Sequence, residues 1–390
     1  MIVCPICHEK RWKRDGMMRK EIMYKRGKRV GRVQLYRCSQ GHQFRKDNLP
    51  SWDDSFIEYV VFVYLKCLSL NTTVDIIRET FEMDILSKAI ILEFIASVGD
   101  ALPSMEEIDV AFAPVRSGHV AFDGVWFKLK GEQIVLLVAF DPKTMDVINA
   151  VWREEEDARG YEELIAKVTG QIGIDKIRAI YSDGDNGFLK ARSKIFTHIP
   201  YQVCVFHKEL RMGQIVPVKN IHRSKRMTDQ KKHDIKIFQL LFRDVIYATD
   251  KEKSSQALER LKQYVKSQKE IEPRFQKAYR SLLTNFKYTL THFDYPYMER
   301  DNNMIENFNS VFKPRLKLMK GFKKEANIDR YLKLFLLQYR LHPLKESGMK
   351  ERNGNSPLEL SGTYIPKNYN FLHLLRTTFN IFYQLPQPEI

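Results

Sequence analysis

Residues 177–207 constrain the fold of this chain more than any other stretch. Residues 177–181 are a short β-branched and aromatic run, typical of a buried strand, and the run stops just before Asp183. A segment with helical spacing follows, and then a second apolar run over residues 201–206. A carboxylate just past the end of a buried strand is where open α/β sheets place their chemistry. The stretch therefore predicts an α/β sheet with a site at one edge.

Charge is distributed unevenly along the 390 residues, whose formal net charge is +16. Residues 10–46 contain 14 Lys/Arg against two acids, and residues 208–340 contain 30 against 15. Residues 117–207, in contrast, contain 11 Lys/Arg against 13 acids. Basic flanks around a slightly acidic centre favour flanks that hold a polyanion and a centre that acts on it. The alternative is a generally basic surface that only aids solubility.

Five cysteines, unevenly spaced, are too few for a disulfide scaffold and fit a reducing compartment. We expect neither a signal peptide nor a membrane span, because the N-terminus leads directly into a cysteine motif and no run of 18 apolar residues occurs. The expected location is intracellular, and cytoplasmic or nucleoid-associated if the host is prokaryotic.

Two short Cys/His pairs predict a zinc ribbon over residues 1–48. Cys4 and Cys7 form a C-x-x-C pair, and Cys38 and His42 form a C-x-x-x-H pair. Each pair lets a tight turn present two ligands to one tetrahedral Zn²⁺, which replaces a core that so short a segment cannot build. A redox C-x-x-C is the alternative. The basic hairpin between the pairs is expected to contact DNA phosphates through Lys25, Arg26, Lys28 and Arg29.

Residues 49–100 predict three helices arranged as a helix-turn-helix that binds DNA, with a plain packing bundle as the alternative. The helices are expected at 54–68, 73–81 and 87–98, with Asn71 or Thr72 capping the second and Cys67 in the core. Residues 101–118 read as a linker, since they contain two prolines and small polar residues.

A sheet of mixed direction is predicted after the linker. Three strands at 119–128, 133–140 and 147–152 make an antiparallel meander, because turn signals separate them. A helix at 160–172 and the stretch described first complete the order β-β-β-α-β-α-β, which is the order of an RNase H-like fold. The predicted core has two parts, 119–207 and 299–341; an all-α insertion, 208–298, separates them, and an extension, 342–390, follows.

Three acids are the candidate catalytic residues. Asp123 lies in the first strand, Asp183 follows the fourth, and Glu306 lies on a helix after the insertion. The first and fourth strands of an RNase H-like sheet are neighbours, so the two aspartates can meet. Three carboxylates repel unless divalent cations bind them, and oxygen ligands suit Mg²⁺ or Mn²⁺, which would promote in-line phosphoryl transfer. Asp185 is a rival of Asp183.

The motifs FDGVWFK, SDGDNGF, CVFH and NNMIENFN together resemble the DDE transposases of the Mutator-like superfamily and its prokaryotic insertion-sequence relatives. The resemblance covers roughly residues 119–341. It matches Asp123, Asp183 and Glu306 to the three family acids, and Cys204 and His207 to the C-x-x-H signature. Cys204 and His207 are therefore either accessory residues or a buried thiol and a core histidine. We expect no second zinc site.

The resemblance implies a transposase that binds element-end DNA, cleaves it, and joins the 3′-hydroxyl ends to target DNA. Its partners would be double-stranded DNA and further copies of itself, in a dimer or a larger assembly. A nuclease that cuts without joining, a transposase-derived DNA-binding regulator, and a zinc-ribbon protein of transcription or RNA handling are the alternatives. Further phosphate contacts are expected from Lys208, Arg211, Lys313, Arg315 and Lys317.

Overall fold

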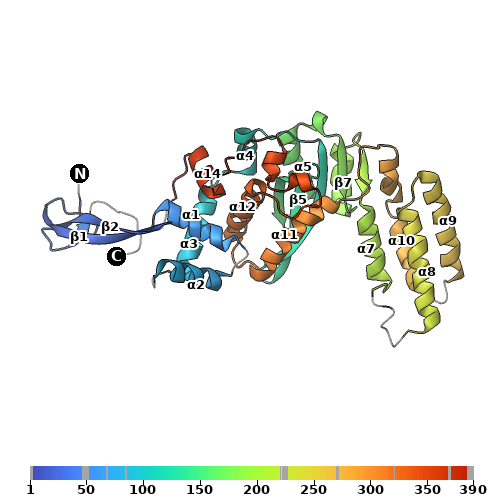
Figure 1. Cartoon of the computed structure of the whole chain (residues 1–390), viewed down its shortest axis with the longest axis horizontal. Coiled ribbons are helices and arrows are strands. Elements are labelled where there is room, and N and C mark those ends of the chain that lie inside the picture. Colours follow the sequence, from blue (N-terminus) through green and yellow to red (C-terminus); the bar gives the residue numbers. More distant parts are fainter. Residues whose placement is uncertain are drawn as a thin grey trace. The chain divides into compact units, whose positions relative to one another are not determined.

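The computed structural model divides into two compact units (Figure 1). The first comprises residues 1–104, 322–338 and 366–390, and the second comprises 105–321 and 339–365. Within them the structure describes residues 3–45, 52–66, 69–83, 86–219, 221, 227–268, 272–319, 321–367 and 370–383. In these ranges, no helix is both long enough and apolar enough to cross a membrane.

The first unit begins with a three-stranded antiparallel sheet in the order β1-β2-β3. Its strands are β1 (Trp12–Tyr24), β2 (Gly27–Cys38) and β3 (Gln43–Arg45). The β1–β2 hairpin turns just before Gly27, whose φ of +126° is a conformation that glycine adopts without strain. This sheet has a very small core of Cys4, Tyr36, Cys38 and Phe44. The hairpin expected from the sequence is therefore present.

Three helices follow in the first unit, namely α1 (Asp54–Tyr64), α2 (Leu70–Phe81) and α3 (Lys88–Ala101). Phe56 of α1 packs edge-on against both Phe81 and Phe94, so all three helices share one aromatic core. The side chain of Ser69 caps α2, so the predicted cap at Asn71 or Thr72 is wrong. Cys67, predicted to be a core residue, lies outside the described residues.

The second unit begins with a helix where a linker was expected. Residues 105–112 form α4 (Met105–Phe112), and the side chains of Met105 and Ile108 are buried. Their spacing of three residues places both on one helical face, and that apolar face needs a partner. The sequence prediction gave weight to the flanking prolines and overlooked this pair.

A five-stranded mixed sheet forms the centre of the second unit, in the order β6-β5-β4-β7-β8. The antiparallel meander predicted from the sequence is present, and β4, β7 and β8 run parallel. The strands are β4 (His119–Leu129), β5 (Glu132–Asp141), β6 (Asp146–Arg153), β7 (Ala179–Ser182) and β8 (Tyr201–Val203). As predicted, the first and fourth strands of the sheet, β4 and β7, are neighbours.

Helices pack on both faces of this sheet. On one face, α5 (Ala158–Ile172) and α6 (Asn186–Ile195) bury Tyr161 and Phe188 against Phe122 of β4. On the other face, α11 (Asn303–Met319) brings Phe308 against Phe140 of β5. Since successive residues of a strand point to opposite faces, Asp123 belongs to the face that α11 covers.

Residues 204–207 differ from the prediction of a strand that ends in the C-x-x-H motif. Strand β8 ends at Val203, Cys204 is the N-cap residue of α7 (Val205–Ile215), and His207 lies in the first turn of that helix. A run of apolar residues suits a buried strand and a buried helix start equally well, and periodicity does not separate them over so few positions.

The predicted all-α insertion forms with its own core. Figure 1 shows its three long helices side by side, and Phe238, Phe242 and Phe275 lie in a cluster separate from the core of the sheet. The helices are α8 (Asp229–Ile246), α9 (Lys251–Ser267) and α10 (Pro273–Leu283), and a 3₁₀ segment, η3 (Phe286–Phe293), follows. The chain then continues through α11, α12 (Glu325–Leu341), α13 (Pro357–Leu360) and α14 (Phe371–Thr378).

Candidate active site

The parallel pairing of β4 with β7 places two of the predicted acids at matching positions. The register pairs His119 with Ala179 and Ala121 with Tyr181, an offset of 60 residues. Asp123 and Asp183 have the same offset, 183 − 123 = 60, so each lies two positions beyond the last pair. Neighbouring strands are about 4.8 Å apart. The pairing of β4 with β7 therefore places Asp123 and Asp183 next to each other, as predicted.

The carboxyl of Asp123 is buried, and no cation among the residues that the structure describes hydrogen-bonds to it. Only 7% of the residue is exposed, Nδ2 of Asn309 donates to its Oδ2 at 2.7 Å, and the backbone N–H of Gly124 donates to its Oδ1 at 3.0 Å. Burial and then the charge of Asp183 raise the pKa of Asp123 to about 6. Asn309 lies one turn beyond Glu306 on α11, so the same helix contacts one acid and carries another.

Asp183 and its rival Asp185 have different roles in the loop after β7. Oδ1 of Asp183 accepts a hydrogen bond from the backbone N–H of Asp185 at 2.9 Å. The carboxylate of Asp185 accepts from the backbone N–H groups of Gly187 and Phe188, and thereby caps α6. Asp185 therefore has a structural role, and this supports the choice of Asp183 as the second acid.

Glu306 is held by the histidine of the C-x-x-H motif. Nε2 of His207 lies 3.1 Å from Oε1 of Glu306, and Nζ of Lys313 lies 4.0 Å from Oε2. Burial alone would lower the pKa of His207, but interactions with Cys204 and Glu306 raise it to about 11. His207 and Glu306 therefore form an ion pair. The hydrogen bond from His207 in turn lowers the pKa of Glu306.

Cys204 anchors the start of the helix that carries Glu306. Its buried Sγ accepts a hydrogen bond from the backbone N–H of Asn302, at 3.2 Å, and the next residue, Asn303, begins helix α11, which carries Glu306 in its first turn. Cys204 and His207 thus both connect α7 to α11. Cys204 is buried and contacts the backbone just before α11, whereas His207 contacts the side chain of Glu306.

A further acid, Glu156, which the sequence prediction did not include, lies beside these residues. A Cβ added at Gly124 would be 2.7 Å from Oε1 and 3.0 Å from Oε2 of Glu156, so the carboxyl lies directly over the glycine. The hydroxyl of Tyr161 donates to Oε1 at 2.6 Å. Burial and the charges of Asp185, Asp183 and Asp123 raise the pKa of Glu156 to about 7. The acidic run of residues 154–157, just after a strand, was a sequence signal that could have identified it.

The four predicted zinc ligands converge in the first unit. One ligand atom from each of Cys4, Cys7, Cys38 and His42 lies within 4.8 Å of all the others. The Sγ atoms of Cys7 and Cys38 are 3.7 Å apart, and Nδ1 of His42 is 3.6 Å from Sγ of Cys38. Three thiols and an imidazole are the donor set of a closed structural zinc site.

No other group of at least three His, Cys, Asp or Glu residues is this compact within the described ranges. Asp123, Asp183 and Glu306 do not form such a group, although the charges of Asp183 and Glu306 both contribute to the raised pKa of Asp123. The triad is gathered less tightly than the Cys/His group.

The predicted phosphate contacts differ in exposure. The side chains at the hairpin turn, Lys25, Arg26, Lys28 and Arg29, are all exposed. Arg211, Lys313 and Lys317 are also exposed, and Arg315 is half-buried. Lys208 is different, because its ammonium donates to the carbonyl oxygens of Ser281 and Thr284, and burial lowers its pKa to about 8.

The geometry of the site does not by itself identify the protein family, and a comparison with known families does. A family model described as transposase, Mutator family, matches residues 50–342. The chain belongs to the Mutator family of transposases. The match includes all three acids, the helical insertion and helices α1, α2 and α3, whereas the whole Cys/His ribbon precedes it. Among curated proteins nothing matches this transposase.

One similar solved structure is titled "CryoEM structure of simian T-cell lymphotropic virus intasome in complex with PP2A regulatory subunit B56 gamma". It is 9% identical, covers 49% of this transposase and 69% of its own chain, and has a TM-score of 0.20. A likeness of that size carries no weight for the fold.

Proposed function

We propose that this Mutator-family transposase binds element-end DNA, cleaves it at a divalent-metal site formed by Asp123, Asp183 and Glu306, and joins the freed 3′-hydroxyl ends to target DNA. The observation that carries the proposal is the matched position of Asp123 and Asp183 on the parallel strands β4 and β7. The strand order β6-β5-β4-β7-β8 supports an RNase H-like core, since it corresponds to sequence order 3-2-1-4-5 with only the second strand antiparallel to the others.

The residues of this site fit Mg²⁺ or Mn²⁺. All donors are carboxylate oxygens, which hard divalent ions prefer. The pKa of Asp123 is raised because its carboxylate is buried and lies near the charge of Asp183. A bound cation would offset both effects. When bound, such ions activate an attacking water or 3′-hydroxyl and stabilise the leaving oxygen.

The other polar groups of the site act on these acids. Asn309 holds one oxygen of Asp123, and His207 holds Glu306, so both orient carboxylates that would otherwise repel each other. Glu156 adds a further carboxyl over Gly124, oriented by Tyr161. We assign His207, Asn309 and Tyr161 as positioning residues and Glu156 as an additional carboxylate of the site.

The first unit would recognise the DNA. The Cys/His group would bind Zn²⁺, and exposed hairpin cations such as Arg26 and Arg29 would contact phosphates, together with the three helices as a helix-turn-helix. Because two element ends must be paired, the active form would be a dimer or larger assembly. An intracellular protein, associated with the nucleoid in a prokaryotic host, fits this role. Substitution Cys38→Ser should abolish stoichiometric zinc in purified protein, as measured by metal analysis.

The test of the proposed function is nicking of supercoiled plasmid DNA in Mg²⁺ or Mn²⁺. Wild type should cut, and Glu306→Gln should not, although both bind DNA equally in a mobility-shift assay. The matched control is Glu325→Gln, because Glu325 is likewise a first-turn glutamate but is exposed on α12. Equal cutting by wild type and Glu306→Gln would show that Glu306 is misassigned. Binding without cutting by all three proteins, also with element-end DNA, would favour a DNA-binding regulator.

A further inference from the structure

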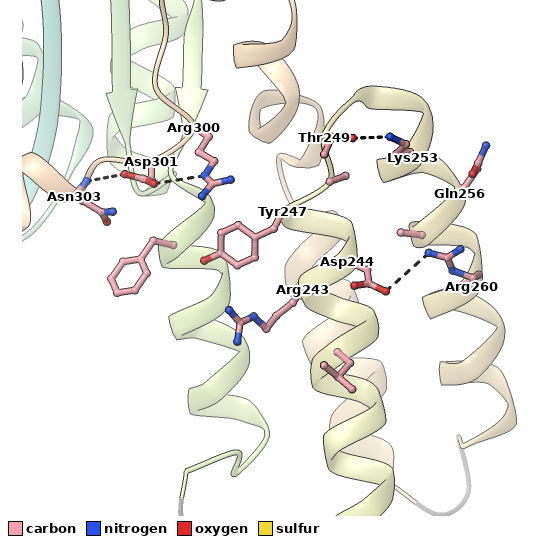
Figure 2. A pocket seen from close by; sticks show the side chains of 14 residues that line it. Arg243, Asp244, Tyr247, Thr249, Lys253, Gln256, Arg260, Arg300, Asp301 and Asn303 are labelled. Carbon is pink, nitrogen blue, oxygen red and sulfur yellow. Dashed lines mark hydrogen bonds and ion pairs between the residues drawn. The ribbon is translucent and has the colours of Figure 1, made fainter.

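A basic pocket lies between the helical insertion and the segment that leads into α11 (Figure 2). Its volume is about 890 Å³, which is within the size of small-molecule sites and ample for a nucleotide. We call it the arginine–tyrosine pocket. Its lining includes Phe206 of α7, Arg243 of α8, Tyr247 at the end of α8, Lys253 and Arg260 of α9, and Arg300.

The charge of this lining favours an anion. The lining contains four cations, Arg243, Lys253, Arg260 and Arg300, and two acids, Asp244 and Asp301. Two further acids outside the lining, Glu209 and Asp250, pair with Arg243 and Lys253. The ion pairs of its three arginines are long: N···O distances are 3.9 Å to Asp244, 3.8 Å to Asp301 and, from Arg243 to Glu209, 3.6 Å. Charge-assisted hydrogen bonds are typically about 2.7–2.9 Å. The arginines can therefore exchange these contacts for phosphate oxygens.

An arginine–aromatic stack gives the pocket a flat surface. The guanidinium of Arg300 lies 5.1 Å from the ring centroid of Tyr247, and that of Arg243 lies 5.6 Å from it. Figure 2 shows Arg300 above the ring of Tyr247 and Arg243 below it, with Arg260 and Lys253 on the neighbouring helix α9. The hydroxyl of Tyr247 donates to Glu209 at 2.7 Å, which fixes the ring. Guanidinium and aromatic planes stack with nucleobases.

The pocket shares two helices with the candidate active site. Phe206 directly precedes His207 on α7, and Asn303 lies three residues before Glu306 on α11. A strand that occupied the pocket would therefore continue toward the carboxylates. A base within a duplex does not expose its faces to such a stack, whereas an unpaired base does.

We propose that the arginine–tyrosine pocket binds one unpaired nucleotide of the DNA strand next to the cleavage site. The base stacks on the Arg300 guanidinium over Tyr247, and Arg243, Lys253 and Arg260 contact the flanking phosphates. This rests on the proposed function only in that the ligand is DNA, because binding can be measured without cleavage.

The test compares two fluorescein-labelled DNAs by anisotropy with the full-length protein. One is a blunt duplex, and the other is the same duplex with a short single-stranded extension. Wild type should bind the extended DNA about tenfold more tightly, the size of one stacked base. Replacing the bases of the extension by abasic sites should remove most of that preference. Wild type that binds both DNAs equally, binds abasic and normal extensions equally, or binds neither DNA would overturn the proposal.

Two variants test whether the preference for the extended DNA comes from the pocket. Arg300→Gln and Arg260→Glu should each reduce the tenfold preference to about twofold or less, with unchanged thermal unfolding. The matched control is Lys262→Glu, because Lys262 is a partly exposed cation of α9 that pairs with Glu259 and does not line the pocket. This control should weaken binding to both DNAs by the same factor, so the ratio of the two affinities should stay the same. Loss of the preference in the control, or its survival in both pocket variants, would assign the binding elsewhere. If wild type keeps the preference but never cuts DNA, the pocket stands and the proposed function fails.

Discussion

Two groups of acids in the second unit, each with one buried member (Asp146 and Asp123), have opposite electrostatic surroundings. In the first, Asp109 and Asp146 face Arg116 and Arg340. Nη2 of the fully buried Arg340 lies 2.5 Å from Asp109 and 2.9 Å from Asp146, and Arg116 bonds both acids as well. Two acids and two arginines make a neutral, hydrogen-bonded network. The pKa of Arg116 is raised, because the two aspartates outweigh the effect of its burial.

In the second group, Asp123, Glu156 and Asp183 lie together, and the hydrogen-bond donors to the first two are an amide, a backbone N–H and a phenol. The pKa of Asp123 rises to about 6 and that of Glu156 to about 7, in both cases chiefly through burial. The structural acids have arginines of this chain as partners, whereas the hydrogen-bond donors to Asp123 and Glu156 are neutral, and we propose that a divalent cation from solution compensates the charge of Asp123. Buried charge without a partner is costly, and such strain is concentrated at functional sites.

We expect the largest effect from the substitution Asp123→Asn. DNA cleavage should fall by at least about a thousandfold, since a metal ligand supplies several kcal/mol of transition-state stabilisation. Thermal stability without divalent ions should stay equal or rise, because the variant removes a buried, repelled charge. The matched control is Asp146→Asn, which should lower stability. If Asp123→Asn destabilised the protein as much as Asp146→Asn, the two groups would not differ as described.

Arg340→Met should lower the free energy of unfolding by about 3–5 kcal/mol, the cost of leaving buried charges without their partner. Denaturant unfolding followed by fluorescence measures this change. Arg330→Met is the control, because Arg330 lies on the same helix, α12, and pairs with an exposed acid, Asp100, at 2.7 Å. An exposed pair contributes about 0–1 kcal/mol. Similar losses in both variants would mean that burial does not decide the strength of these pairs.

The third prediction concerns pH. In the folded protein the pKa values of Asp123 and Glu156 are raised, so the native state binds more protons than the unfolded state between about pH 4 and 7. Stability without metal must therefore fall as pH rises through this range. Asp123→Asn removes part of this dependence. The melting temperature of the variant should exceed that of wild type by several degrees at pH 8 and by little at pH 4.

Divalent ions provide the check on that third prediction. Added Mg²⁺ should raise the melting temperature of wild type at pH 8 and leave Asp123→Asn nearly unchanged, because binding to the native state stabilises it. A pH-independent difference between the two proteins would count against the raised pKa of Asp123.

The smallest expected effect comes from Gly124→Ala, which tests the fourth carboxyl. The added methyl would meet the carboxylate of Glu156, so cleavage should fall about tenfold while DNA binding is unchanged. Gly170→Ala is the control, since a Cβ there meets nothing within 4 Å. The double variant with Glu156→Gln should lose no more than the larger single effect, because the two changes act on one contact. Additive losses would show that Gly124 acts through another neighbour.

Much of the sheet was predictable because its signals are local. Alternating or continuous apolar runs separated by turns at residues 130–131 and 141–143 gave the meander with bounds close to those of β4, β5 and β6. The Cys4–His42 set was predictable from spacing alone. In contrast, α4 and the start of α7 were missed, since each depends on burial against distant elements rather than on local spacing.

The site residues likewise fall into those that local motifs identified and those that only the three-dimensional structure reveals. Asp123, Asp183 and Glu306 were identified from motifs, and the choice of them as metal ligands remains a prediction. Glu156 was missed because its contact with Gly124 joins a loop to a strand 32 positions earlier. The hydrogen bonds from Asn309 and His207 were equally inaccessible to sequence reasoning, because they depend on how α11 lies across the sheet.

The place of Glu306, beyond the helical insertion, has a consequence for protein synthesis. The sheet that carries Asp123 and Asp183 is made first, and 306 − 123 = 183 further residues must be translated after Asp123 before the third acid exists. At ribosomal speeds of about 5–20 residues per second, this delay is roughly 10–40 s. If Glu306 is needed for cleavage, as we propose, a growing chain on the ribosome that has already folded its sheet would still be unable to cut DNA. Chains released early, by a premature stop codon, would be harmless to the genome in the same way.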